Sequence, residues 1–134
     1  MSTTNKGASA LSVLIVEDDD FAQEVLLGML EDFGINDIHT ADDGRDGLRV
    51  LEAMPSAPDF IICDILMPDM DGMKFLAELV KVNHKGKVIL VSGIDSEILA
   101  IAEQAVASDG IHIVGAFVKP IKNEVLAKAM GLSE

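Results

Sequence analysis

Reactive side chains follow four short apolar runs of this sequence. Four acids come after SVLIV, an aspartate after FIIC, a serine after KVILV and a lysine after IVGAFV, namely Glu17–Asp20, Asp64, Ser92 and Lys119. If these runs are parallel strands of one sheet, their carboxyl ends share an edge, and the reactive groups converge there. Two carboxylates ~4 Å apart repel by about 4 kcal/mol at an effective dielectric of about 20. A divalent cation would remove that repulsion, and Mg²⁺ (or Mn²⁺) suits the site because it accepts a few carboxylates and also binds phosphate oxygens.

Carboxylates, a metal ion, a hydroxyl and an ammonium group together suit phosphoryl transfer. Asp64 is the best nucleophile, because it stands alone at the tip of an apolar strand. Glu17 and Asp18 are better placed to hold the metal. Lys119 would neutralise charge on the transferred group, and Ser92 would donate a hydrogen bond to it.

Short β-rich runs alternate with segments of helical periodicity along the chain. Strands are expected over 12–16, 37–41, 60–63, 87–91 and 113–118, with apolar residues at helical spacing within 21–33, 43–54, 73–80, 98–106 and 121–130. In the first of these segments the helical spacing is shared by Phe21, Val25, Leu26, Met29, Leu30 and Phe33. The fourth helix is expected to be lined by Ile98, Leu99, Ala102, Ala105 and Val106. The alternation predicts an α/β fold, with a parallel sheet covered by helices on both faces.

Length and charge limit the classes of partner. The 134 residues fit one domain over 11–134, preceded by a flexible tail over 1–10. The net charge of −13 argues against nucleic acid and against an anionic membrane surface. No apolar stretch approaches the ~20 residues that span a bilayer, and no secretory signal is recognisable, so we expect a cytoplasmic protein. The single cysteine, Cys63, is expected to be a buried apolar residue.

Five motifs carry a resemblance to a known family. LIVEDD, ADDGRDGL, PDFIICDILMPDMDG, ILVSG and FVKPI extend from Leu14 to Ile121, nearly the whole domain. Together they resemble the response-regulator receiver domains of bacterial two-component systems. The resemblance implies a flavodoxin-like, doubly wound, five-stranded parallel sheet of order 2-1-3-4-5 with five helices. GIHIVGAFVKP (110–120) resembles receivers fused to cyclic-dinucleotide phosphodiesterases.

The resemblance also implies roles for individual residues. Asp64 matches the phosphoacceptor, and the metal would be held by Glu17, Asp18, Asp64 and the backbone carbonyl of Leu66. Ser92 matches the switch hydroxyl, Lys119 matches the family's lysine, and the Lys119–Pro120 peptide is expected to be cis. The implied phosphoryl donor is a sensor histidine kinase or a phosphotransfer protein. The implied output partner is a downstream effector, a fused output domain or a second copy of the chain.

One departure from the family pattern leaves an alternative open. The aromatic residue usual three positions before the lysine is replaced by Ala116, and strand alternation directs the neighbouring Phe117 to the other face. A pseudo-receiver, folded alike but used as a constitutive interaction scaffold, is therefore the alternative function. An aspartate-dependent phosphatase is disfavoured, because Leu66 stands where such enzymes carry a second aspartate. Leu66 and Ile94 are expected to flank the mouth of the pocket and to hinder attacking water.

Overall fold

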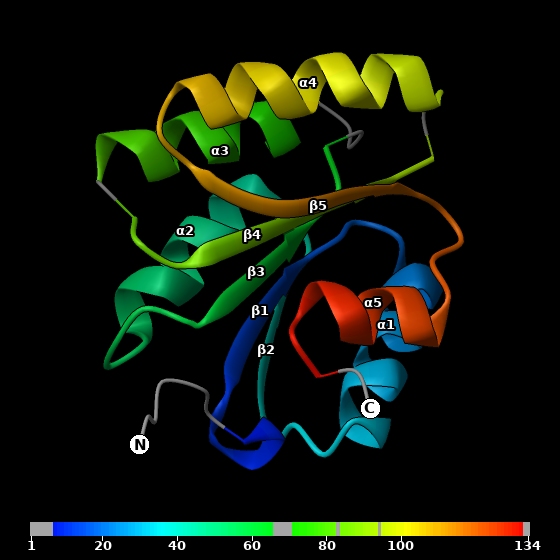
Figure 1. Ribbon diagram of the computed structural model, residues 1–134. Coiled ribbons are helices and arrows are strands. Elements are labelled where there is room, and N and C mark those ends of the chain that lie inside the picture. The colour runs from blue at the N-terminus through cyan, green and yellow to red at the C-terminus, as the bar shows by residue number, and fades with distance from the viewer. Residues whose placement is uncertain (1–6, 66–70, 83, 94, 133–134) are drawn as a thin grey trace, which may run out of the picture.

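The computed structural model describes residues 7–65, 71–82, 84–93 and 95–132. A five-stranded parallel sheet has the order β2-β1-β3-β4-β5 (Figure 1). Its strands are β1 (Ser12–Val16), β2 (Asp37–Ala41), β3 (Phe60–Cys63), β4 (Lys87–Ser92) and β5 (His112–Val118). The order is the one implied by the family resemblance, and every strand lies within one residue of its expected range.

Burial explains why the inner strands are easy to recognise in the sequence. β3 is buried at all four residues, and β1 and β4 are buried at all but their first residue. A strand with a neighbour on each side and helices on both faces meets only apolar surroundings, so it reads as one continuous apolar run. β2 lies at the edge of the sheet, where the polar residues Asp37 and Thr40 are exposed.

The described part of the chain contains five α-helices, which divide between the two faces of the sheet (Figure 1). They are α1 (Asp20–Asp32), α2 (Gly44–Ala53), α3 (Asp71–Lys81), α4 (Ser96–Ser108) and α5 (Asn123–Ala129). Side chains of α1 and α5 form one buried core with the sheet, and side chains of α2, α3 and α4 form the other. The fold is therefore doubly wound, as the resemblance implies.

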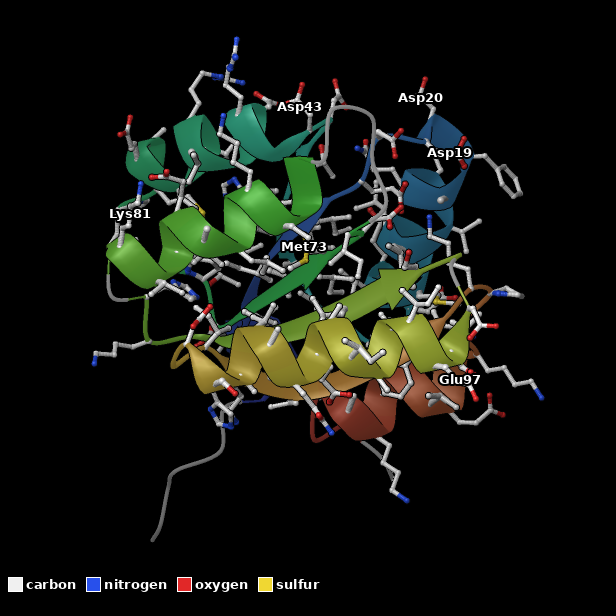
Figure 2. The ribbon with its side chains drawn as sticks, turned by 90° about the horizontal axis from the view of Figure 1, so that it is seen from above. Asp19, Asp20, Asp43, Met73, Lys81 and Glu97 are labelled. Atoms are coloured by element: carbon white, nitrogen blue, oxygen red, sulfur yellow. The ribbon has the colours of Figure 1, made fainter. Side chains whose placement is uncertain are left out.

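Capping fixes the starts of α1 and α2 at the carboxyl edge of the sheet. Asp19 accepts a hydrogen bond from the backbone N–H of Ala22, and Asp43 accepts one from that of Asp46. A side-chain oxygen at this position satisfies one of the free N–H groups of the first turn. Figure 2 shows Asp19 and Asp20 at the start of α1 and Asp43 at the start of α2, on the same side of the molecule.

The apolar faces expected for two helices are partly wrong. Phe21 is 74% exposed and Val25 40% exposed, whereas Leu26 and Leu30 are the buried residues of α1. On α4, Ile98 is 57% exposed and Ala105 is exposed, whereas Leu99 and Val106 are buried. In each helix an exposed residue comes directly before a buried one: Val25 before Leu26, and Ile98 before Leu99. Consecutive residues of a helix are about 100° apart around its axis. The exposed residues therefore form a second apolar stripe that lies beside the buried one.

β5 contains a bulge that decides which face its side chains reach. Val88 pairs with Ile113, but the next residue of β4, Ile89, pairs with Gly115, so Val114 is an extra residue. After the bulge, Ala116 packs with the core of α2, α3 and α4, and Phe117 packs with the core of α1 and α5. The prediction that Phe117 lies on the opposite face from Ala116 is confirmed.

The start of the chain is described from residue 7 onward. Ala8–Ala10 form a short 3-10 helix, and Ala8 packs against the core of α1 and α5. The boundary expected at residue 10 stays a prediction. No helix among the described residues has the length and apolar character needed to cross a bilayer.

Candidate functional site

Three acids meet at the carboxyl edge of the sheet. Oxygen atoms of Glu17, Asp18 and Asp64 all lie within 4.8 Å of one another. Strand pairing accounts for this convergence, because Val16 and Cys63 are partners in neighbouring strands and the backbone N–H of Asp64 donates to the carbonyl of Val16 at 3.0 Å. The acids that follow β1 and β3 are therefore side by side, at the point where the strand order of the sheet reverses.

Lys119, which follows the edge strand β5, forms ion pairs with two of these acids. Its Nζ lies 2.7 Å from Glu17 Oε1 and 2.9 Å from Asp64 Oδ2. The backbone N–H of Lys119 donates to the carbonyl of Ser92 at 2.8 Å, which anchors the end of β5 to the end of β4. The Lys119–Pro120 peptide is cis, as expected from the resemblance.

Burial sets the charge balance of the site. Glu17 is 1% exposed and Asp64 is 5% exposed, whereas Asp18 lies open to solvent. Burial raises the pKa of Glu17, and this effect is opposed by Lys119 and by the backbone N–H of Asp19, which donates to Glu17 Oε2 at 3.0 Å. Burial alone would lower the pKa of Lys119, but hydrogen bonds to Glu17 and Asp64 raise it above its usual value. The ammonium group is therefore charged at neutral pH and offsets the repulsion between the two carboxylates.

The remaining expected residues fall partly inside the described region. Ser92 ends β4 at the same edge of the sheet, and its side chain is fully buried. Cys63 is buried, and its thiol donates to the carbonyl of Asp64 at 3.4 Å, which agrees with the apolar role expected for it. Leu66 and Ile94 lie outside the described residues, so their expected roles stay predictions.

The donor set fits a hard divalent cation. The clustered groups are carboxylate oxygens, the ligand type that Mg²⁺ and Ca²⁺ prefer, and no sulfur or imidazole ligand joins them among the residues that the structure describes. Asp18 gives the cluster an open side, which a cation that keeps several waters requires. Glu17, Asp18 and Asp64 are the residues that would hold such an ion.

Two residues beside the acids were given no role at the site from the sequence. The side-chain amide of Gln23 in α1 donates a hydrogen bond to the backbone carbonyl of Glu17. Gly72 of α3 packs against the backbone of Asp64. Gly72 stands in the motif PDMDG, and a glycine in such a motif could have predicted that two backbone segments approach closely there. Gln23 stands in a helix with no such marker.

Comparisons with known proteins agree on one family. The family model described as the response regulator receiver domain matches residues 13–131. The chain is 33% identical over 120 residues to the probable C4-dicarboxylate response regulator DctR of Bacillus subtilis, covering 88% of this chain and 50% of that protein. It is also 33% identical over 85 residues to the chemotaxis protein CheY of Treponema pallidum, covering 63% of this chain and 59% of that protein. The chain thus spans only about half the length of these curated relatives.

Solved structures support the same assignment. A response regulator from Colwellia psychrerythraea superposes with a TM-score of 0.77 at 32% identity, covering 91% of this chain and 95% of that one. A chain of the CheX-CheY-BeF3-Mg+2 complex from Borrelia burgdorferi gives a TM-score of 0.76 at 25% identity, covering 89% of this chain and 85% of the matched one. With the family match over 13–131, these likenesses show that the chain belongs to the response regulator receiver domains.

Proposed function

We propose that this receiver accepts a phosphoryl group on Asp64, in a Mg²⁺-dependent transfer from a phosphohistidine. The observation that carries the proposal is the environment of the Asp64 carboxylate. Its Oδ2 is 2.9 Å from the Lys119 ammonium, and it belongs to the cluster of three acids whose oxygens lie within 4.8 Å of one another. A nucleophile, a fixed positive charge and a set of metal-holding oxygens are the parts that phosphoryl transfer needs.

The residues of the chain divide the chemistry between them. A carboxylate oxygen of Asp64 attacks phosphorus, the P–N bond to the donor imidazole breaks, and the imidazole leaves with the bonding electron pair. Lys119, which already contacts Asp64, neutralises negative charge on the transferred group, and Ser92 donates a hydrogen bond to it. Glu17, Asp18 and Asp64 would hold Mg²⁺, which would supply further positive charge to stabilise the transferred group. Water later hydrolyses the acyl phosphate, so the phosphorylated state of the chain has a limited lifetime.

An apolar groove beside Lys119 supports a protein donor. The groove has a volume of about 310 Å³ and runs between α1 and the segment that follows β5. Its wall includes Phe21 and Val25, the exposed apolar stripe of α1, together with Pro120 and Ile121. Lys119 also lines the groove, and its ammonium group contacts Asp64. A helix of a sensor histidine kinase or of a phosphotransfer protein, seated in the groove, would bring its phosphohistidine to Asp64.

The output partner is proposed on the other face of the molecule. Ile98 and Ile101 of α4 and Val118 of β5 are exposed large apolar residues. They offer a surface for a downstream effector, for a fused output domain or for a second copy of the chain. Relatives include the sensor kinase CckA of Brucella abortus and a protein-glutamate methylesterase of Halobacterium salinarum, of which this chain covers 9% and 23%. Fusion to a cyclic-dinucleotide phosphodiesterase stays a prediction from residues 110–120.

A constitutive scaffold is the alternative function, and Ala116 favours it. Ala116 packs against the core that α4 shares with α2 and α3, so this side of the sheet carries a methyl group where the family usually has an aromatic ring. A pseudo-receiver would keep the fold and the surface without accepting phosphate. Its weakness is that the three acids, Ser92 and Lys119 are all retained.

Intact-mass analysis separates these functions. The chain is incubated with acetyl phosphate and Mg²⁺, and the expected product is one added phosphoryl group on the wild type. The addition should vanish in Asp64→Asn and when EDTA replaces Mg²⁺. A wild-type chain that neither gains a phosphoryl group nor consumes acetyl phosphate with Mg²⁺ present would contradict the phosphoacceptor proposal and favour the scaffold. Turnover of many acetyl phosphate molecules without retained phosphate would instead indicate a phosphatase.

A further inference from the structure

Gln23 presents its side-chain amide to three acceptors at the top of the sheet. Its Nε2 lies 3.1 Å from the carbonyl oxygen of Glu17, 3.3 Å from Asp42 Oδ1 and 3.4 Å from the carbonyl oxygen of Ala41. None of these three atoms can donate, so the amide must face them with its nitrogen. An amide nitrogen carries two N–H groups, which the three acceptors share.

The backbone carbonyl of Glu17 lies between two of the clustered acids along the chain. It belongs to the peptide unit that joins Glu17 to Asp18, and this unit is planar. On the other side of Glu17, its backbone N–H donates to the carbonyl of Ala41 at 3.1 Å. Hydrogen bonds on both sides of the residue therefore fix the direction in which the chain leaves β1. That direction determines where the Glu17 and Asp18 carboxylates sit relative to Asp64.

We propose that Gln23 is a positioning residue that holds the Glu17–Asp18 peptide and thereby sets the Mg²⁺ affinity of the site. The inference rests on the proposed function, because it assumes that these acids hold the metal. Gln23 hydrogen-bonds the backbone carbonyl of Glu17, and we infer that it acts on the carboxylates through the backbone that carries two of them. Outer partners of metal ligands typically change metal affinity by about 10- to 100-fold when they are replaced.

Gln23 also ties the loop after β1 to the loop after β2. Asp42 follows β2, and its own backbone N–H donates to Asp46 Oδ2 at 3.1 Å at the start of α2. The contact between Gln23 and Asp42 therefore links the start of α1 to the start of α2, across two neighbouring strand ends. The site acids and this second acidic loop are held as one unit.

Two substitutions of Gln23 separate positioning from simple electrostatics. Gln23→Met keeps the length of the side chain and removes the donors. Gln23→Glu keeps the shape, faces three acceptors with another acceptor, and adds a negative charge near the acids. Charge alone predicts tighter cation binding in Gln23→Glu. Loss of the donor predicts weaker binding in both variants, so the two explanations differ in the sign of the Gln23→Glu effect.

Isothermal titration of the full chain with MgCl₂ tests the proposal. We expect Mg²⁺ affinity to fall about tenfold in Gln23→Met, and to fall in Gln23→Glu as well. The control is Leu27→Ala, which removes partly buried packing from the same helix without touching the acid loop. It should lower the thermal midpoint and keep the wild-type affinity. The rise in thermal midpoint at saturating Mg²⁺ gives a second readout of the same affinities.

The outcomes distinguish the inference from the function beneath it. Wild-type affinity in Gln23→Met, or tighter binding in Gln23→Glu, would overturn the role of Gln23 while leaving Mg²⁺ binding and phosphorylation of the wild type intact. Weaker binding in Leu27→Ala to the same degree would reduce the effect to general loosening of α1, and would also overturn it. A wild-type chain that binds no Mg²⁺ would remove both proposals. If Gln23→Glu does not fold, Gln23→Met decides alone.

Discussion

Gly72 lies directly against the backbone of Asp64. A Cβ atom on Gly72 would sit 2.4 Å from the carbonyl oxygen of Asp64 and 2.4 Å from the Cα of Ile65. Gly72 belongs to the first turn of α3, so this contact sets how closely α3 approaches the residue that we propose as phosphoacceptor. The neighbouring atoms are backbone, which cannot move aside as a flexible side chain could.

Gly72→Ala should therefore damage both stability and the site. We expect a loss of about 1–3 kcal/mol in the free energy of unfolding, as for other overpacked sites, and slower phosphorylation of Asp64 by acetyl phosphate. The matched control is Gly28→Ala, where a Cβ in α1 meets nothing within 4 Å. That change should gain up to about 1 kcal/mol, because alanine loses less backbone freedom in a helix. Urea unfolding and a mass time course measure the two effects, and a neutral Gly72→Ala would contradict the packing argument.

The fold could be predicted because the inner strands have simple surroundings. SVLIV, FIIC and KVILV lie between two neighbouring strands and under helices on both faces, so every side chain after Ser12 and Lys87, the first residues of β1 and β4, had to be apolar. The acids after β1 and β3 then had to share an edge, because consecutive parallel strands end on the same side. The convergence of Glu17, Asp18, Asp64 and Lys119 follows from topology, which periodicity reveals.

Other features depend on tertiary contacts that a sequence pattern does not contain. The second apolar stripes of α1 and α4 have the same periodicity as the buried stripes, so Phe21 and Ile98 could not be distinguished from core residues. The bulge at Val114 arises from pairing with β4, and the one sign of it in the sequence is the neighbouring Gly115. A Cβ on Gly115 would lie 2.5 Å from the ring of Phe117. Gln23 is an ordinary helix residue until β2 is placed beside β1.

Lys119 should stabilise the metal-free protein more than the metal-bound one. In Lys119→Met, the carboxylates of Glu17 and Asp64 face each other without the ammonium group that now contacts both. Breaking a buried ion pair costs about 3–5 kcal/mol, and we expect about 1–3 kcal/mol because the Lys119 side chain is 26% exposed. Mg²⁺ should then raise the thermal midpoint of Lys119→Met more than that of the wild type.

A nearby lysine provides the control for this measurement. Lys122 is exposed, and Lys122→Met removes the same charge from the chain close to the site. It should change neither the metal-free stability nor the Mg²⁺ response beyond the small effect of net charge. Equal Mg²⁺ responses in Lys119→Met and in the wild type would show that the ammonium group does not offset the repulsion between the acids.

The groove on α1 predicts a division between protein and small donors. Phe21→Ala removes a large exposed apolar side chain from its wall, and buried aromatic anchors are typical hot spots of protein interfaces. We expect about tenfold slower transfer from an autophosphorylated histidine kinase that phosphorylates the wild type, equivalent to about 1.4 kcal/mol. Phosphorylation by acetyl phosphate should keep the wild-type rate, because Phe21 is not one of the acids, Ser92 or Lys119.

Ile101→Ala is the matched control for the groove. Ile101 is 69% exposed on α4, so the variant loses a comparable apolar side chain from a surface outside the groove. It should receive phosphate from the kinase at the wild-type rate. If Phe21→Ala slows transfer from acetyl phosphate as well, the side chain acts on the chemistry, and the docking role is wrong.

His84 should make the protein sensitive to mild acid. Its Nε2 is buried and has no hydrogen-bond partner among the described residues, and burial lowers its pKa from the ordinary value of 6.5. His84 therefore binds a proton more readily in the unfolded chain than in the folded chain. The free energy of unfolding should consequently be highest above pH 6.5 and should decrease as the pH falls below that value. His84→Leu removes this titration, while every carboxylate stays common to both proteins. Urea unfolding between pH 8 and pH 5 should show the wild type losing stability faster than His84→Leu, and parallel curves would mean that the buried imidazole does not titrate in this range.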